Sequence, residues 1–272
     1  MQKILDLTNK HIVLATPLIL YSLISSIYLV VSASSGKVIN VLFAFILFML
    51  MTTAFIAGWF NMIKIVIINP ELNEPNSLIK DFPAGVGEYF LSSLGSVLIM
   101  FILSIFLFIA SYYIGINFIG NPEISAQALS DALQNSSALK TFVSSLSIEQ
   151  LEKLNYWNML ILATTSLGSF LIFLYMPALF FENKNPIKAY LVSLKKLFSK
   201  NFFKTLGLFL LIIFLNSIIS IFATVFSGNM LLHFSITLLN FYFITIVCVG
   251  VFYYYYHSFC KPLIGQNVDL EV

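Results

Sequence analysis

Arginine is absent from this chain: all 14 of its basic residues are lysine, and charged residues of both signs make up only 10% of the sequence. Without guanidinium groups the chain cannot form the bidentate clamps that hold a carboxylate or a phosphate, so an anion would have to be bound by ammonium groups. The formal net charge of +2 is too small for the basic surface typical of nucleic-acid-binding proteins. We therefore predict no nucleic-acid partner.

Cysteine and histidine are also scarce. Cys248 and Cys260 fall in the same apolar run, where a helix would separate them by about 18 Å, beyond the reach of a disulfide. We interpret both as packing residues. His11, His233 and His257 lie in three separate segments without cysteine or carboxylate neighbours, so we predict neither a metal site nor a cofactor.

Motifs of catalysis are missing as well. The sequence has no recognisable Ser-His-Asp set, carboxylate pair, glycine-rich phosphate loop or HExxH motif. We therefore expect a protein that is not an enzyme. The acidic residues outside the apolar runs are scattered; they include Glu71, Glu74, Asp81 and Glu88.

Apolar residues dominate what is present. They make up 59% of the chain, and the mean hydropathy of +0.94 is far above that of soluble proteins. A helix needs roughly twenty apolar residues to cross the hydrocarbon, and lipid offers an unpaired backbone no partner. The sequence therefore predicts an all-α polytopic bundle, a single membrane domain over 1–272, with spans near 12–34, 39–62, 92–116, 157–180, 203–226 and 231–256.

Lysine placement predicts the orientation. Cytoplasmic segments carry an excess of lysine, and a cytoplasmic N-terminus puts eleven lysines inside and only Lys37, Lys140 and Lys153 outside. We therefore expect both termini in the cytoplasm of a bacterial cell, with the protein in the cytoplasmic membrane. The inside lysines are Lys3, Lys10, Lys64, Lys80, Lys184, Lys188, Lys195, Lys196, Lys200, Lys204 and Lys261.

The first span allows a second interpretation. Val31, Ser32 and Ala33 resemble a signal-peptidase site, although the apolar run before them is longer than that of an ordinary signal peptide. We expect this span to be retained. Cleavage would leave five spans and an external N-terminus.

Residues 121–155 form the longest polar segment, and we expect a small helical cap outside the membrane. Pro122 suits the start of a helix, and Ser147 with Gln150 forms a capping box before the fourth span. The segment could bind a partner or be a solvated loop.

The connector 186–201 has the pattern of an amphipathic helix. On a helix, its apolar residues would lie along one arc of the circumference, and its lysines would lie around the remainder of the circumference. The lysines either set the topology and form a solvated face, or they gather anionic lipid headgroups or an acidic partner. The candidate binding residues are Lys188, Lys195, Lys196 and Lys200.

The same pattern recurs 112 residues earlier. Ile79 and Phe82 fall under Leu191 and Leu194, and Gly95 falls under Gly207. This spacing predicts two parallel repeats, 39–116 and 157–226, each with an interfacial helix between two spans.

Few ionisable residues lie within the spans. Lys64 and Glu182 sit at equivalent ends of the two copies and could pair, or Lys64 could extend its ammonium group to water. The absence of acids at mid-depth argues against an ion-coupled transporter. Thr164-x-x-x-Gly168 favours close helix packing.

The connector and its flanks resemble a family. The run "FFENKNPIKAYLVSLKKLFSKNFFKTLGLFLLIIFLN" and the aromatic "VFYYYYHSF" are similar to the membrane domain of glycerophosphoryl diester phosphodiesterases and related six-span bacterial proteins. The resemblance implies a six-span domain and carries no activity, because no stretch resembles the soluble phosphodiesterase domain. It rests on Glu182, Ala189, Ser193, Asn201, Phe202 and Gly207.

Together these features favour a non-enzymatic scaffold or envelope protein that engages membrane lipids, anionic ones among them, a membrane protein partner or a second copy of itself. The alternative is a permease or lipid carrier with a groove between the repeats. A polar or laterally open cavity among the second to fifth spans would favour the carrier, and a dry packed centre would favour the scaffold.

Overall fold

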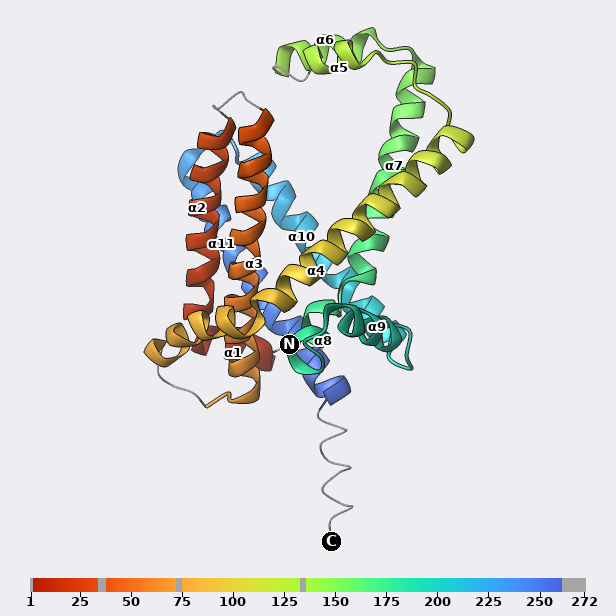
Figure 1. Ribbon diagram of the computed structural model, residues 1–272. Helices are drawn as coiled ribbons and strands as arrows, with labels where there is room; N and C mark the ends of the chain where they lie inside the picture. The colour runs from red at the N-terminus through yellow and green to blue at the C-terminus, as the bar shows by residue number, and fades with distance from the viewer. Residues whose placement is uncertain (1, 34–37, 72–74, 133–135, 261–272) are drawn as a thin grey trace. The chain divides into compact units, whose positions relative to one another are not determined.

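The computed structural model describes residues 2–33, 38–71, 75–132 and 136–260, and every element in this part of the chain is a helix (Figure 1). A 3-10 turn at Ile12–Leu14 links the first two helices, and a π-helical turn at Tyr256–Cys260 follows the last. The α-helices are α1 (Gln2–Lys10), α2 (Ala15–Ala33), α3 (Val38–Ile68), α4 (Pro75–Phe118), α5 (Ala126–Ala132), α6 (Ser136–Ser145), α7 (Ile148–Leu171), α8 (Tyr175–Phe181), α9 (Pro186–Leu197), α10 (Phe202–Val225) and α11 (Met230–Tyr255).

The predicted helical class and number of spans are confirmed. Within the described residues, six helical stretches are long and apolar enough to cross a membrane. The third and fourth begin well before the predicted residues 92 and 157. The stretches are Ile12–Ser32, Leu42–Ile68, Ser77–Phe118, Ile148–Phe181, Phe202–Val225 and Met230–Cys260.

The two predicted interfacial helices differ in form. The first is not a separate element, because α4 runs on through Pro83 without a break. Its 44 residues measure about 66 Å, twice the roughly 30 Å of hydrocarbon, so part of α4 must lie outside it. The second, α9, is separate: Asn185 caps its first turn by accepting a hydrogen bond from the Lys188 N–H at 3.1 Å. The internal repeat itself stays a prediction.

The fourth span is interrupted, where the sequence suggested a continuous helix. α7 ends at Leu171, and α8 begins at Tyr175, whose N–H donates to the Ile172 carbonyl at 3.0 Å. Pro177 accounts for the break, because it has no N–H to donate and its ring clashes with the carbonyl four residues earlier. Six residues of α8 are buried: Tyr175, Met176, Pro177, Ala178, Leu179 and Phe180.

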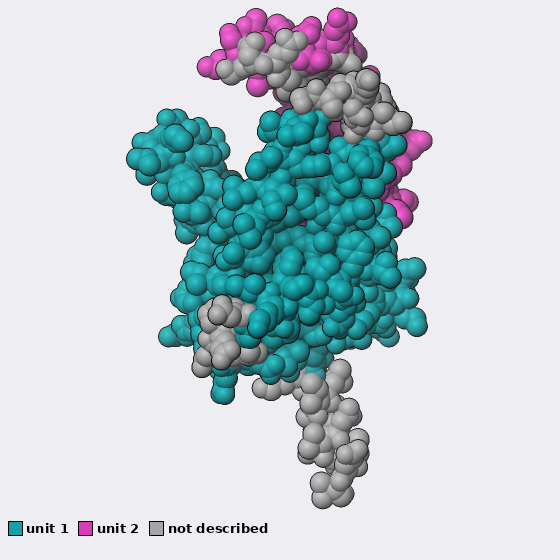
Figure 2. Space-filling view, turned by 60° about the vertical axis from the view of Figure 1, so that its left-hand side comes forward, with its two compact units in different colours: residues 1–99, 171–272 teal, residues 100–170 magenta. Residues whose placement is uncertain are grey.

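The chain divides into two compact units, residues 1–99 with 171–272 and residues 100–170 (Figure 2). Unit 1 has an aromatic core in which Phe180 of α8 stacks on Tyr89 at 4.4 Å between ring centroids and meets Phe60 edge-on at 5.9 Å. Trp59 donates its indole N–H to the Leu14 carbonyl at 2.7 Å, which ties α3 to the turn before α2. α8 is therefore the central element of unit 1.

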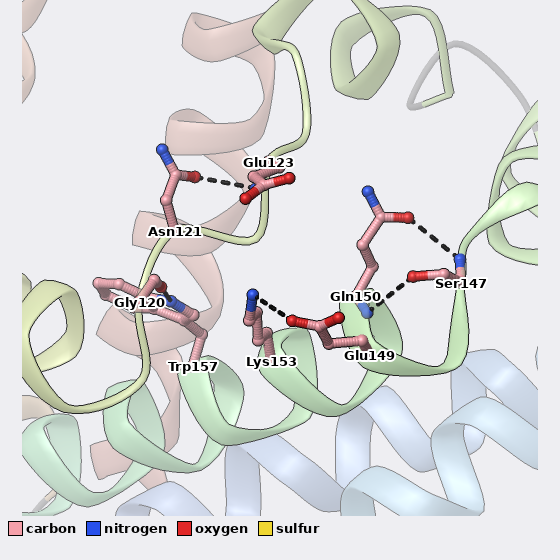
Figure 3. Close-up of polar contacts among 8 residues, drawn as sticks. All are labelled: Gly120, Asn121, Glu123, Ser147, Glu149, Gln150, Lys153 and Trp157. Carbon is pink, nitrogen blue, oxygen red and sulfur yellow. Dashed lines mark hydrogen bonds and ion pairs between the residues drawn. The ribbon is translucent and has the colours of Figure 1, made fainter.

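Unit 2 contains the predicted capping box (Figure 3). The Ser147 N–H donates to Oε1 of Gln150 at 3.0 Å, and the Gln150 N–H donates to the Ser147 hydroxyl at 3.2 Å. The expected close packing is also present, because a Cβ added at Gly168 would lie 2.9 Å from Leu107. Short-range patterns were thus sufficient to predict this part of unit 2.

The predicted helix start at Pro122 is wrong, because the next helix, α5, begins only at Ala126. Asn121 instead accepts a hydrogen bond from the Glu123 N–H at 3.0 Å, and Glu123 has a φ of 57° (Figure 3). This side-chain turn competes with the helix for the same backbone group. Gly120, at a φ of 85°, directs its carbonyl to the Trp157 indole N–H at 2.9 Å.

Two glycines of α4 allow a matched test of the packing of α4 against α9. A Cβ added at Gly95 would lie 2.5 Å from Cγ of Pro186, whereas one added at Gly87 would meet no heavy atom within 4 Å. We expect Gly95→Ala to destabilise the protein by about 1–3 kcal/mol through overpacking, and Gly87→Ala to stabilise it by about 0.5–1 kcal/mol. Melting temperatures in one detergent measure both, and equal shifts of the same sign would contradict the packing.

Candidate functional site

Helix α9 has three distinct faces. Ala189, Ser193 and Leu197, spaced by four residues, are buried in unit 1. On another side, Ile187 and Leu191 are 64% and 60% exposed. The predicted apolar arc is therefore divided: Ile187 and Leu191 point away from the core, whereas Leu197 of the same arc is buried beside the smaller Ala189 and Ser193.

Three of the four predicted lysines are open to the surroundings. Lys188 and Lys195 are exposed and lie about 40–100° around the helix from Ile187 and Leu191, since each residue advances the helix by about 100°. Lys200 is exposed in the turn after α9. Among the described residues, no ion pair involves any of these three.

Lys196 does not share that exposure, so the set of four candidate lysines needs correction. Its side chain is 18% exposed and forms an ion pair with Glu182. Its Nζ atom lies 4.9 Å from the ring centroid of Tyr255 and 5.3 Å from that of Phe259. Lys196 therefore fixes α9 to unit 1 and is not available to a ligand.

An open pocket of about 640 Å³ lies on the exposed side of α9. Its floor is apolar and one edge is basic. This combination suits an amphiphile, whose chain would contact the apolar residues while its charged group meets the lysine. The lining residues are Leu191, Val192, Leu194, Lys195 and Phe198.

The Glu182 carboxylate, just after α8, interacts with donor groups from three helical segments. Its Oε1 atom pairs with Lys196 of α9 and accepts a hydrogen bond from the Tyr255 hydroxyl of α11 at 2.6 Å. The Cys260 thiol of the π-helical turn approaches it at 3.7 Å. The Glu182 side chain is 25% exposed, so these donors replace part of the water around its Oε1 atom.

Lys64 and Glu182, the predicted pair, take different partners in the structure. The Lys64 ammonium group donates to the Tyr89 hydroxyl at 2.6 Å and lies 5.1 Å from the centroid of that ring. The Lys184 ammonium group lies 5.1 Å from the same ring and pairs with Glu88 at 2.8 Å. The partner of Lys64 is therefore Tyr89, where we had considered Glu182.

Tyr89 and Tyr255 are the site residues that sequence reasoning missed. Both are almost fully buried, at 1% and 0% exposure. Within the aromatic run that follows Val251, the side chains of Phe252 and Tyr255 are buried. Their three-residue spacing was the one available signal, since it continues the helical face of Val249.

Comparisons with protein-family models, with curated proteins and with solved structures found no match to this chain. The search for groups of three or more His, Cys, Asp or Glu side chains able to hold a metal ion, made over the described residues, also found none. Function must therefore be argued from the geometry of α9 and its neighbours.

The Glu182 cluster predicts a contrast between two carboxylates. Glu182→Gln leaves Lys196 without its charge partner in a mostly buried site, and we expect a loss of about 1–3 kcal/mol in the free energy of unfolding. Glu88→Gln is the matched control, because the side chains of Glu88 and Lys184 are 45% and 58% exposed and such pairs contribute about 1 kcal/mol or less.

Thermal unfolding in detergent measures both losses. A double-mutant cycle of Glu182→Gln with Lys196→Gln should give a coupling energy that the equivalent cycle for Glu88 and Lys184 lacks. Equal effects for the two carboxylates would show that Glu182 does not hold α9.

Proposed function

We propose that this chain is a non-enzymatic scaffold of the bacterial cytoplasmic membrane that uses α9 to hold anionic lipid headgroups. One observation carries the proposal: the exposed apolar side of α9 is bordered by Lys188 and Lys195, whose ammonium groups have no ion-pair partner in the described structure. A helix with this arrangement lies along the boundary between hydrocarbon and water. Anionic headgroups at that depth meet both ammonium groups.

The distribution of lysines supports the orientation in this proposal. The exposed lysines of α9 would face the cytoplasm, where anionic lipids attract basic segments at about 1 kcal/mol per residue. The resemblance of residues 180–216 to the membrane domain of glycerophosphoryl diester phosphodiesterases agrees with such a placement. We include membership of that group of six-span proteins in the proposal.

The three exposed lysines, Lys188, Lys195 and Lys200, are not needed to hold α9 in place. Ala189, Ser193 and Leu197 already bury one face, and Lys196 anchors the helix through Glu182. The attraction of the three exposed lysines for lipid should therefore appear as bound lipid and hardly at all as stability of the fold. This difference separates a lipid-binding face from a merely solvated one.

A lipid carrier or permease is the second candidate, and the break between α7 and α8 favours it. Discontinuous helices border the binding sites of many transporters. In this chain, however, Leu174 at the break is 1% exposed and α8 is buried in aromatic side chains. A cysteine placed at Leu174 should stay unreactive toward a water-soluble thiol reagent if the protein is a scaffold, whereas rapid labelling would favour the carrier.

Removal of three lysines tests the lipid-binding face. We expect Lys188→Gln, Lys195→Gln and Lys200→Gln together to reduce co-purified anionic lipid by tenfold or more, since three headgroup contacts contribute roughly 3 kcal/mol. The melting temperature should change little. The matched control removes three exposed lysines elsewhere, with Lys80→Gln, Lys140→Gln and Lys204→Gln.

Native mass spectrometry of protein released from gentle detergent measures the bound lipid. Equal retention of anionic lipid by the two triple variants would contradict the proposal, because the lysines of α9 would then form only a solvated face.

A further inference from the structure

Residues 2–10 form a helix of their own, α1, ahead of the first span. Leu7 and Thr8 of α1 are 8% and 0% exposed. Ile4 packs near Gly250 of α11, where an added Cβ would be 3.7 Å from its side chain. The 3-10 turn at Ile12–Leu14 then redirects the chain into α2. α1 is thus a fixed part of unit 1.

A pocket of about 470 Å³ opens between α1, the end of α3 and the end of α11. Lys3, Asp6, Leu7 and Lys10 line it from one face of α1, at the helical spacing of three, four and seven residues. Apolar residues at the end of α3 form a second wall. The size is that of a small-ligand site.

The charged groups on α1 are largely uncommitted. Neither Lys3 nor Asp6 has an ion-pair partner in the part of the chain that the structure describes. Lys10 donates one hydrogen bond, to the Pro70 carbonyl at 2.9 Å, which fixes its ammonium group at the rim and leaves two N–H donors. Burial lowers the pKa of the neighbouring His11 imidazole.

The π-helical turn forms the wall of this pocket opposite α1, through Tyr256 and His257. His257 stacks on Tyr253 at 4.0 Å between ring centroids, and its Nδ1 atom lies 3.1 Å from the Tyr253 carbonyl. An Nδ1–H that donates to this carbonyl leaves Nε2 as the free edge of the ring. π-helical turns are rare and occur frequently at functional sites.

We propose that this pocket binds a phosphoethanolamine group, with the phosphate between Lys3 and Lys10 and the ammonium group at Asp6. Two ammonium groups beside one carboxylate match a ligand that carries a phosphate and an amine. Leu7, Ile67 and Ile68 give the pocket apolar walls, which suit the glycerol and first chain atoms of a phospholipid. Because these residues are not those of α9, this inference stands independently of the proposed function.

The test uses the full chain in nanodiscs with equal amounts of phosphatidylethanolamine, phosphatidylglycerol and phosphatidylcholine, followed by native mass spectrometry. We expect the wild type to retain phosphatidylethanolamine preferentially. Lys3→Gln with Lys10→Gln should reduce that retention by about tenfold or more. Lys80→Gln with Lys204→Gln removes the same charge elsewhere and should leave it unchanged.

Two further variants separate charge from folding and assign specificity. Lys3→Arg with Lys10→Arg keeps both charges and should keep the lipid. Asp6→Asn should still retain phospholipid but lose the preference for phosphatidylethanolamine over phosphatidylglycerol. Unchanged retention in the glutamine variant, or an unchanged preference in Asp6→Asn, would overturn the site.

Soluble O-phosphoethanolamine and inorganic phosphate, added to delipidated protein, distinguish the source of the ligand. Stabilisation of the wild type by O-phosphoethanolamine, absent in the glutamine variant and without retained lipid, would support the site and assign it to a free compound. Equal stabilisation by inorganic phosphate would overturn the role of Asp6.

Discussion

A mostly buried carboxylate at the end of α8 determines how α9 is oriented. Glu182 needs donors to replace water, and it finds them in Lys196 and the Tyr255 hydroxyl. The inward turn of Lys196 and the buried Ala189, Ser193 and Leu197 together fix the rotation of α9 about its axis. Ile187 and Leu191 must then face outward, with Lys188 and Lys195 beside them. The face that we propose for lipid therefore depends on the ion pair of Lys196 with Glu182 together with the buried residues of α9.

The same end of α11 borders both the Glu182 cluster and the pocket against α1. Phe259 and Cys260 of the π-helical turn border the Glu182 cluster, and Tyr256 and His257 line the pocket against α1. Tyr256 also packs on Phe181 at 5.3 Å between ring centroids. In a chain without arginine, the Glu182 carboxylate is met by an ammonium group and a tyrosine hydroxyl.

Local patterns predicted the features that depend on near neighbours. Length and hydropathy were enough for the six spans, and the capping box of Ser147 with Gln150 could be read from four residues. The inward turn of Lys196 could not be predicted, because the helical spacing of residues in α9 shows only that Lys196 lies away from the apolar arc. Its two partners, the Glu182 carboxylate and the Tyr255 ring, lie 14 and 59 residues away in the chain. Pro177 was a missed signal, since its position already implied the break before α8.

The proposed function depends most directly on an orientation that the lysines predict, in which α9 and the first turns of α4 meet water on the same side of the membrane. Single cysteines at residues 80, 195 and 140, in a chain with Cys248 and Cys260 replaced by serine, test it with a membrane-impermeant thiol reagent applied to sealed vesicles of known orientation. The account predicts that residues 80 and 195 react from one side and residue 140 from the other. Labelling of residues 80 and 195 from opposite sides would contradict it.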